Sequence, residues 1–436
     1  MSFDLPALPE GWSYEALGNC CKRNSITYGV VQPGTSLIEG KPLIRVNNFR
    51  DRHLDLSDVM YIAPEIEAKY SRTRLNGGEV LLTVVGSVGQ VIVVPKALAG
   101  FNVARAVAVI HPIAGIDAEW VAICLRSPLS QYLLGSRANT TVQTTINLKD
   151  VRALPIPLPP NSERRAIAEF IGALDGRIAL LRETNTTLEA IAQALFKSWF
   201  VDFDPVRAKL EGRVPEGMDE ATAALFPDVL VESELGLIPA GWIVRPLDEI
   251  AKYLNGLALQ KFPPTADSWL PVIKIAQLRK GDTVGADRAG RNIKPEYLIQ
   301  NGDVLFSWSG SLEVEVWCGG EGALNQHLFK VSSDAYPKWF YYLWTKYHLE
   351  NFRRIAASKA TTMGHIQRVH LTNALVVTPP ETFVSSIGEF FAPLLGRWIA
   401  TSLQAQNLAT LRDTLLPRLI SGQLRLTGNV TPFEEA

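Results

Sequence analysis

The chain has 436 residues, of which 47% are hydrophobic and 20% charged, with 43 basic against 44 acidic side chains. At roughly 150 residues per domain this length predicts about three folded units, and the composition is that of an ordinary globular protein. These values exclude a mainly disordered chain and a uniformly basic nucleic-acid coat protein.

The sequence predicts neither a membrane span nor a secretory signal. The longest uncharged apolar stretch, at 80–95, has 16 residues, fewer than the ~20 that a membrane helix needs, and we interpret it as a buried hairpin. No basic segment precedes an apolar run at the N-terminus, and the four cysteines show no CxxC spacing. We therefore expect a cytoplasmic protein without structural disulfides or a metal site.

The chain contains an internal duplication. The LPEGW motif at 8–12 returns as IPAGW at 238–242, and GEVLLTVVGS at 78–87 returns as GDVLFSWSGS at 302–311. Further on, Trp120 matches Trp339, and the double proline at 159–160 matches that at 379–380. The order is kept while the offset shrinks from 230 to 220, which indicates small loop deletions in the second copy.

Each copy begins with a part of mixed α and β character, at 1–160 and 236–380. β-Branched runs such as 91–94 and 106–110, separated by glycine and proline, predict strands. A tryptophan-led amphipathic stretch in each copy, at 119–134 and 338–353, predicts helix.

After the double proline each copy changes to a helical period, within 161–235 and 381–436. Apolar residues recur at alternating steps of four and three, which is typical of a coiled coil. The predicted seam residues are Ile167, Ile171, Leu174, Ile178, Leu181, Leu188, Leu195, Ile387, Phe391, Leu394, Trp398, Leu408, Leu415 and Leu419. We predict that the two helices pair with each other and that the polar Asn185 fixes their register. The alternative is two separate helices, each packed on its own domain.

The charges are unevenly distributed along the chain. Residues 161–235 carry 8 basic and 14 acidic side chains, whereas 1–160 carry 15 and 13, and 236–380 carry 16 and 12. The segment 200–235, which has no counterpart in the second copy, is interpreted as an acidic surface connector.

Catalytic signatures are missing from the sequence. Residues 34–41 depart from a phosphate loop in spacing, and Pro42 stands where Ser or Thr must bind magnesium. His365 and His370 are five residues apart, which does not place two metal ligands on one helix face. The double prolines lack the following aromatic residue with which DNA amino-methyltransferases stack a flipped base. We expect no catalytic residue, metal or cofactor in this chain.

Three segments carry a resemblance to a known family: LFKSWFVDFDPVR at 195–207, ELGLIPAGW at 234–242 and LRDTLLPRLISGQ at 411–423. Together with the repeat and the seam, they make the sequence similar, over essentially its whole length, to the DNA-specificity subunits of Type I restriction–modification systems. The resemblance implies an α+β fold with two similar target-recognition domains, 1–160 and 236–380. Each is followed by a long helix, within 161–235 and 381–436, and the two helices pair antiparallel as a spine.

The resemblance also implies function and partners. Such a subunit is not an enzyme itself. It binds double-stranded DNA and directs separate adenine methyltransferase subunits, of which two are expected, and endonuclease/translocase subunits. S-adenosylmethionine is then expected in the methyltransferase and not in this chain.

Helix length supports a divided DNA site. A helix over 161–199 spans ~58 Å, whereas one turn of DNA spans ~34–36 Å. Two domains on such helices can therefore reach major grooves a turn or more apart. We predict a bipartite site with two short halves around an unread spacer, and the halves should differ because the two copies differ in sequence.

Polar residues in loops after strands are the candidate DNA contacts, because Arg, Lys, Asn, Gln, Ser and Thr read base edges and Arg and Lys bind phosphates. In the first copy they are Arg45, Asn47, Asn48, Arg50, Ser87, Gln90, Arg105, Arg137, Asn139, Thr140, Thr141, Gln143 and Thr144. In the second copy they are Lys274, Gln277, Arg279, Lys280, Ser309, Ser311, Gln326, His327, Lys359, Thr361, Thr362, His365, Gln367 and Arg368. For each single residue the alternative is a solvated loop or a turn-stabilising group. Asn102 and Asn325 match between the copies and are interpreted as turn formers.

Two other functions stay open from the sequence alone. A duplicated two-lobed enzyme requires paired catalytic groups, but the carboxylates kept in both copies, Glu79 with Asp303 and Glu169 with Glu389, lie near no candidate nucleophile. A protein scaffold without DNA readout differs from the specificity subunit only in lacking a DNA contact surface.

Overall fold

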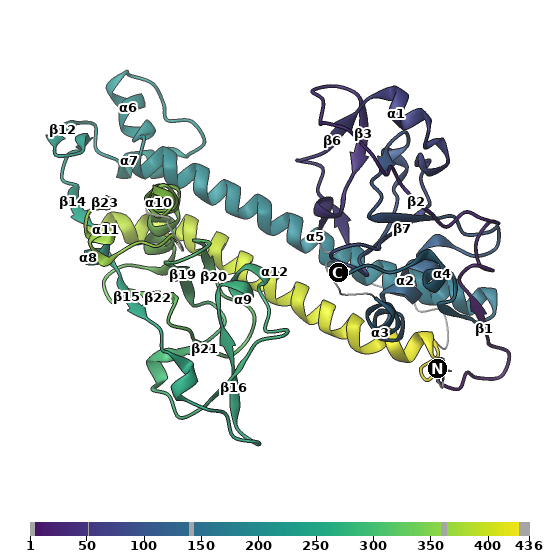
Figure 1. Ribbon diagram of the computed structural model, residues 1–436. Helices are drawn as coiled ribbons and strands as arrows, with labels where there is room; N and C mark the ends of the chain where they lie inside the picture. Colours follow the sequence, from purple (N-terminus) through teal and green to yellow (C-terminus); the bar gives the residue numbers. More distant parts are fainter. Residues whose placement is uncertain (1–4, 51, 139–143, 359–363, 427–436) are drawn as a thin grey trace. The chain divides into compact units, whose positions relative to one another are not determined.

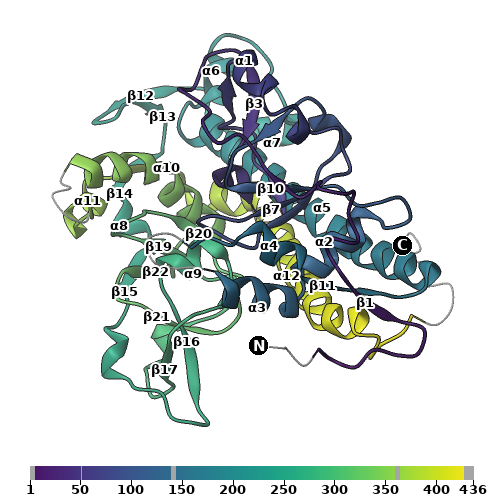
Figure 2. The ribbon, with the colours of Figure 1, turned by 45° about the vertical axis from the view of Figure 1, so that its right-hand side comes forward.

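The computed structural model describes residues 5–50, 52–138, 144–358 and 364–426. The chain forms two compact units, Met1–Arg177 with Leu408–Ala436, and Ile178–Asn407 (Figures 1 and 2). Two long helices, α5 (Asn161–Phe200) and α12 (Glu381–Ile420), contribute residues to both units.

The first unit is built on a four-stranded antiparallel sheet with the order β2–β10–β7–β8. Its strands are β2 (Thr27–Tyr28), β7 (Val80–Thr83), β8 (Val91–Val93) and β10 (Val107–Ile110). Val80 pairs with Val93, which confirms the predicted hairpin. Alternate residues of β7 enter two different cores, Val80 and Leu82 on one face and Leu81 on the other, as the two-residue period of a strand requires.

Smaller elements surround this sheet. The other strands are β1 (Ser13–Ala16), β3 (Lys41–Ile44), β4 (Phe49–Arg50), β5 (His53–Leu54), β6 (Met60–Ile62), β9 (Asn102–Val103) and β11 (Pro155–Leu158). The helices are α1 (Pro64–Ala68), α2 (Ala118–Arg126), α3 (Pro128–Arg137) and α4 (Leu148–Arg152). Strands β6, β3 and β9 form a three-stranded sheet, while β1 pairs with β11 and β4 with β5.

The second unit has a four-stranded sheet with the order β15–β22–β19–β20 and a second one with the order β17–β16–β21–β18. Its strands are β12 (Leu230–Ser233), β13 (Gly236–Pro239), β14 (Ile243–Pro246), β15 (Lys252–Asn255), β16 (Trp269–Ile273), β17 (Arg288–Gly290), β18 (Leu298–Ile299), β19 (Val304–Ser307), β20 (Val314–Val316), β21 (Gly322–Leu324), β22 (Leu328–Ser332) and β23 (Leu375–Thr378). The helices are α6 (Asp204–Leu210), α7 (Glu220–Leu225), α8 (Leu247–Ile250), α9 (Ile275–Lys280), α10 (Lys338–Ser358) and α11 (Arg368–Thr372).

The two units repeat one topology. The sheet β2–β10–β7–β8 corresponds to β15–β22–β19–β20, the pair β1–β11 to β14–β23, and β6–β3–β9 to β17–β16–β21. In each unit, the second of these sheets contains one parallel pair, β3 with β9 and β16 with β21. The duplication predicted from the sequence is therefore present in the strand order, and the predicted fold class is confirmed.

The tryptophan-led helix differs between the copies. Residues 119–134 do not form one helix: α2 ends at Arg126, and α3 starts at Pro128 with the Ser127 hydroxyl accepting a hydrogen bond from the Ser130 N–H. A proline lacks an N–H and suits the first position of a helix but not its interior. The second copy has no proline between 338 and 358, and α10 runs unbroken for 21 residues.

Helices α5 and α12 pack together in antiparallel orientation. In the first unit, the start of α5 and the end of α12 share a core that contains Ile171 and Leu416. In the second unit, the end of α5 and the start of α12 share another, in which the rings of Phe196 and Phe391 lie 6.4 Å apart. The mutual pairing predicted from the two heptad patterns is confirmed over the alternative of separate helices.

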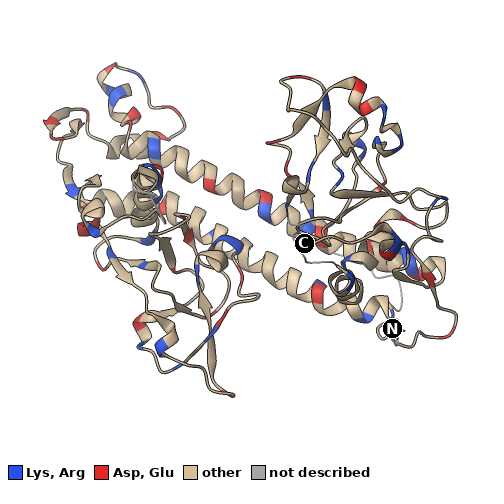
Figure 3. Cartoon of the chain, in the orientation of Figure 1, with Lys and Arg blue, Asp and Glu red and all other residues tan. Residues whose placement is uncertain are grey.

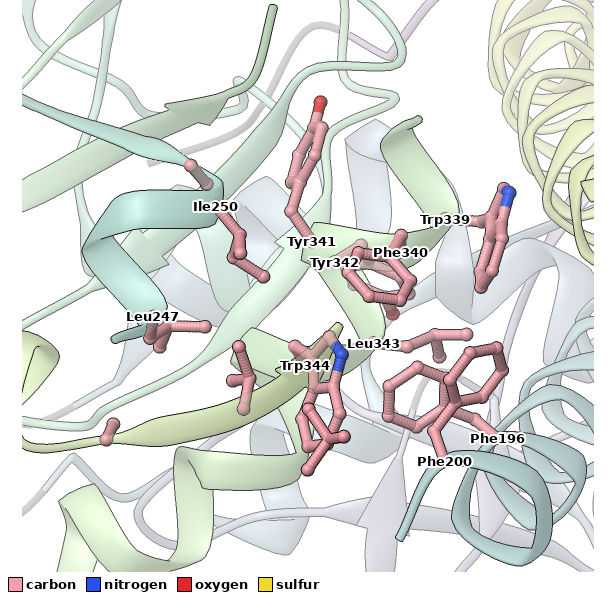
Figure 4. Close-up of a cluster of buried hydrophobic side chains, with 14 of the residues drawn as sticks. Phe196, Phe200, Leu247, Ile250, Trp339, Phe340, Tyr341, Tyr342, Leu343 and Trp344 are labelled. Atoms are coloured by element: carbon pink, nitrogen blue, oxygen red, sulfur yellow. The ribbon is translucent and has the colours of Figure 1, made fainter. Parts of the chain in front are cut away.

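Aromatic side chains dominate the core of the second unit (Figure 4). Phe196 and Phe200, which belong to the segment 195–207, lie against helix α10: the Phe196 ring is 5.0 Å from that of Trp344, and the Phe200 ring is 5.8 Å from that of Trp339. Both phenylalanines are buried. This part of the family-like segment is therefore explained by packing.

Candidate nucleic-acid interface

Each unit contains one turn–loop site, in which the turn of the buried hairpin meets the loop before a short helix. In the first unit, the Gly86 N–H donates to the Thr144 carbonyl (2.8 Å) and the Ile146 N–H to the Val84 carbonyl (3.0 Å). In the second, the Gly310 N–H donates to the Gly364 carbonyl (2.8 Å) and the Ile366 N–H to the Trp308 carbonyl (2.9 Å). The same two backbone hydrogen bonds thus occur in both units.

A buried hydroxyl closes each hairpin turn. In the first unit, Thr83 Oγ1 donates to the Ser87 carbonyl and accepts from the Gln90 N–H (2.9 Å). In the second, Ser307 Oγ donates to the Ser311 carbonyl (2.6 Å) and accepts from the Glu313 N–H (2.7 Å). Gly86 and Gly310 adopt φ values of 78° and 67°, which glycine tolerates best. The turns are therefore firmly shaped, and they leave Ser87, Gln90 and Ser311 exposed.

The second turn–loop site carries aromatic and imidazole side chains. The Ser309 hydroxyl lies 3.0 Å from His327 Nδ1. The Trp308 ring lies 5.9 Å from the His327 ring and 6.3 Å from the exposed His365 ring, and its Nε1–H donates to Asn255 Oδ1 (2.9 Å). This site thus gathers three side chains that can stack on bases or hydrogen-bond to them, Trp308, His327 and His365, while Ser309 is itself buried.

The equivalent positions of the first site hold small or aliphatic residues. The Val84 N–H donates to the Ala106 carbonyl as the Trp308 N–H does to the His327 carbonyl, and Val85 bridges to Thr145 as Ser309 does to His365. Trp308 of the second copy therefore corresponds to Val84 of the first, and Ser309 to Val85. His327 corresponds to Ala106, and His365 to Thr145. The two sites share a backbone and differ in side chains, so their chemistry differs most here.

A second pair of matched positions lies after strands β3 and β16. Arg45 Nη2 pairs with Asp58 Oδ2 (3.0 Å), and Lys274 pairs with Asp287 in the same way. Asn48 and Gln277 are buried, and their side-chain oxygens accept from the N–H groups of Arg45 (2.8 Å) and Lys274 (3.3 Å). The fold itself accounts for Asn48 and Gln277, because a base contact would have to break these hydrogen bonds.

The remaining candidates lie at several places. Asn47, Arg50, Arg105, Arg279, Lys280, Gln367 and Arg368 are exposed, and Arg137, Thr144 and Gln326 are half-buried. The turn–loop sites bring together Ser87, Gln90 and Thr144 in the first unit, and Ser309, Ser311, Gln326, His327, His365, Gln367 and Arg368 in the second. Asn139, Thr140, Thr141, Gln143, Lys359, Thr361 and Thr362 lie outside the described residues, in the segments directly before the two loops.

The matching of Asn102 with Asn325 is wrong. Strand β9 pairs Asn102 with Leu43, and the equivalent strand β21 pairs Ala323 with Val272, so the counterpart of Asn102 is Ala323. Asn102 is fully buried and hydrogen-bonds Thr73 Oγ1 (2.8 Å) and Glu67 Oε1 (3.1 Å). Asparagine recurs in the second copy two residues after the true counterpart, and this produces the false match.

Sequence reasoning also missed Trp308, which lies at the centre of the second site. Tryptophan is not one of the polar residues that read base edges, so the predicted contacts do not include it. The signal was available in the repeat itself, where the segment 302–311 places tryptophan opposite the valine at 84.

The predicted seam residues all lie on α5 and α12. Ile167, Ile171, Leu174, Ile178, Leu181, Ile387, Phe391 and Leu419 are buried, and Leu188, Leu195, Leu394, Trp398, Leu408 and Leu415 are half-buried. Asn185 Nδ2 donates to Ser402 Oγ (2.7 Å), and its Oδ1 accepts from Thr401 Oγ1.

Basic and acidic side chains are interspersed over each unit (Figure 3). Within the part of the chain that the structure describes, no three His, Cys, Asp or Glu side chains are grouped to hold a metal ion. None of the described helices combines the length and the apolar character of a membrane span.

Comparison with known proteins finds similarity to one family. Residues 21–190 match the family described as "Type I restriction modification DNA specificity domain". The chain is 32% identical over 198 residues to the Type I restriction enzyme EcoBI specificity subunit of Escherichia coli, covering 43% of this chain and 42% of that subunit. It is 24% identical over 359 residues to the MjaIX specificity subunit of Methanocaldococcus jannaschii, covering 80% and 78%. This chain is related to Type I specificity subunits.

A solved structure supports the fold. The S subunit of a Type I system from M. genitalium aligns over 95% of this chain and 98% of that one, with a TM-score of 0.50 and 14% identity. The similar proteins are named as specificity subunits of restriction enzymes, which agrees with the family resemblance drawn from the sequence. The match spans less than half the length of the EcoBI subunit.

Proposed function

We propose that the chain is the DNA-reading subunit of a Type I restriction–modification system acting in the cytoplasm. Each unit reads one half of a bipartite, asymmetric DNA site, and the paired helices α5 and α12 determine the length of the unread spacer. The observation that carries this proposal is the turn–loop site, which occurs twice on one backbone pattern with different side chains. A duplicated fold of this kind suits two half-sites of different sequence.

The chain in this proposal supplies recognition and no chemistry. Separate adenine methyltransferase subunits, two per complex, bind S-adenosylmethionine and modify the site, and endonuclease/translocase subunits join the same complex. In this proposal the two recognition domains are residues 1–160 and 236–380. Their exposed basic and polar residues contact the DNA.

The first test is to co-express the chain with its neighbouring methyltransferase and to map methylated adenines in the host genome by single-molecule sequencing. We expect methylation at one split motif. If a competent methyltransferase modifies nothing, or modifies the same sites without this chain, the recognition role is wrong.

The second test exchanges side chains between the two turn–loop sites. Trp308→Val, His327→Ala and His365→Thr install the first copy's residues in the second site. Since a lost base contact costs ~1–3 kcal/mol, we expect discrimination to fall by about 10- to 100-fold in one half of the motif and to stay unchanged in the other. Val284→Ala, at a position 73% exposed in the same unit, should leave both halves unchanged. An unaltered motif in the folded triple variant would contradict base reading at this site.

A further inference from the structure

One basic residue occupies the same place in both units. Arg126 of α2 donates from Nε and Nη2 to the Val91 carbonyl (3.2 and 3.1 Å), and Lys346 of α10 donates from Nζ to the Val314 carbonyl (2.9 Å). Val91 and Val314 each begin the second strand of the buried hairpin. The two side chains are therefore structurally equivalent.

Both basic residues also reach a carboxylate of helix α5. Arg126 Nη1 lies 3.7 Å from Asp175 Oδ2, and Lys346 Nζ lies 2.9 Å from Glu189 Oε1. The Arg126 and Lys346 side chains are 13% and 16% exposed. In each unit, the hairpin of the recognition domain is thereby joined to α5 through one largely buried cation.

Asp175 also forms ion pairs with two further arginines. Its Oδ1 accepts from Arg412 Nη1 of α12 (2.6 Å) and from Arg52 Nη1 (2.9 Å). Arg52 belongs to the turn between β4 and β5 and has a φ of 72°, which a non-glycine residue rarely adopts. One carboxylate of α5 is thus bound by three arginines, from the β4–β5 turn, from α2 and from α12.

Glu189 has a similar position in the second unit. The Tyr342 hydroxyl lies 3.5 Å from Glu189 Oε1, and Lys346 also pairs with Glu315 of β20 (2.8 Å). Burial lowers the pKa of the Arg126 guanidinium to about 10. Burial disfavours the charge of Lys346 too, but Glu315 and Glu189 outweigh it and raise its pKa. Both cations are therefore charged at neutral pH.

Such ion pairs, in which the cation is largely buried and the Asp175 and Glu189 side chains are 24% and 27% exposed, suit orientation better than stability. Apolar contacts between a domain and a helix are non-directional, so they determine orientation through shape alone. A buried ion pair contributes little net stability because desolvation opposes it, but a misplaced partner leaves a charge unpaired, which is strongly unfavourable. Asp175 and Glu189 are 14 residues apart, two heptads, and so occupy the same heptad position on α5.

We propose that Asp175 and Glu189 are positioning residues that hold each recognition domain at one orientation on α5, and so make the complex strict about the length of the DNA spacer. This inference rests on the proposed function. The bases read are determined elsewhere, so loosening these contacts should change the spacing that is accepted and not the half-site sequences.

The test uses Asp175→Asn and Glu189→Gln in the full chain, co-expressed with the methyltransferase, with methylated adenines mapped across the genome. We expect the wild-type half-sites to persist, while sites whose spacer is one base pair longer or shorter gain methylation by about tenfold over wild type. Glu163→Gln, which removes an ion pair between α5 and Arg425, is the control and should keep one spacer length.

Three outcomes separate the possibilities. If the variants direct less methylation, but only to sites with a single spacer length, the two carboxylates are merely structural and the inference is overturned. If the wild-type chain directs no methylation to a split motif, the proposed function itself fails. Should Asp175→Asn not fold, Asp175→Glu keeps the charge and lengthens the side chain, and Glu189→Gln tests the other unit; one strict spacer in both would equally overturn the inference.

Discussion

His348 of α10 is a half-buried histidine beside the aromatic core of the second unit. Its ring stacks on that of Trp344, with the centroids 6.1 Å apart and the planes at 24°, and its Nε2 lies 3.0 Å from the Leu375 carbonyl. Burial lowers the pKa of His348 from its usual 6.5 to about 4. The folded protein therefore keeps this side chain neutral and uses it as a hydrogen-bond donor to strand β23.

This histidine should make stability depend on pH. The unfolded chain protonates His348 below about pH 6.5 and the folded chain only near pH 4, so its contribution is full above pH 6.5 and declines as the pH falls to 4, by up to ~3 kcal/mol. We expect His348→Gln, which keeps an N–H donor, to reduce the loss of urea stability between pH 7 and pH 5. His53→Gln, at an exposed position, should not. Equal losses in wild type and H348Q would contradict this assignment.

Polar residues inside the seam find their partners across it. The heptad pattern contains Asn185 on the first helix and Thr401 and Arg412 on the second. Asn185 hydrogen-bonds Thr401, and Arg412 binds Asp175, which follows a seam leucine. The sequence predicted that these positions are polar and Asn185 a determinant of register, but partners on another helix are determined only by the pairing register.

At the scale of elements, the register of the two helices is constant. Asp175 contacts Arg412 in the first unit, and Asn185 contacts Ser402 in the second. Between these two contacts α5 advances by ten residues, while α12 goes back by ten residues. Phe196 with Phe391 continues the same register. The orientation had come from the family resemblance, since a heptad pattern is the same for parallel and antiparallel pairs.

Phe391 of α12 lies at the centre of a cluster of aromatic rings in the second unit. It is 1% exposed and lies within 4.6 to 6.4 Å, ring to ring, of Trp339, Trp199, Phe200 and Phe196. Phe391→Ala should destabilise the protein by about 3–5 kcal/mol, because truncation loses buried area and leaves a cavity. Phe390→Ala, one residue earlier and 41% exposed, should cost much less. Chemical denaturation followed by tryptophan fluorescence measures both, and similar losses would show that the packing is not as described.

At the scale of the whole molecule, duplication was readable from the sequence because backbone-determining residues recur. Glycines that turn the hairpin, hydroxyls that close it and the alternation of buried valine and leucine return in order. The sequence did not predict as well which individual side chains of the two copies occupy equivalent positions. Asn102 and Asn325 look alike but differ by two strand positions, and Asn48 and Gln277 look like base readers but cap turns in the interior.

The duplicated organisation predicts that the two halves of recognition are separable. Replacement of residues 1–160 by the equivalent segment of another specificity subunit should change one half of the methylated motif and leave the other half and the spacer as they are. Genome-wide mapping of methylated adenines gives the answer directly. A change in both halves, or in the spacer alone, would contradict the proposed division of labour.

The sequence by itself determined the two-copy organisation, the buried hairpin, the two long helices and their apolar seam, because these depend on local periodicity and on glycine and proline at turns. Only the tertiary structure decided which helix residues meet, where the Trp308 cluster forms, and that Arg126 and Lys346 converge on α5. Those contacts join residues up to 237 positions apart. They depend on how strands and helices pack, which no local pattern encodes.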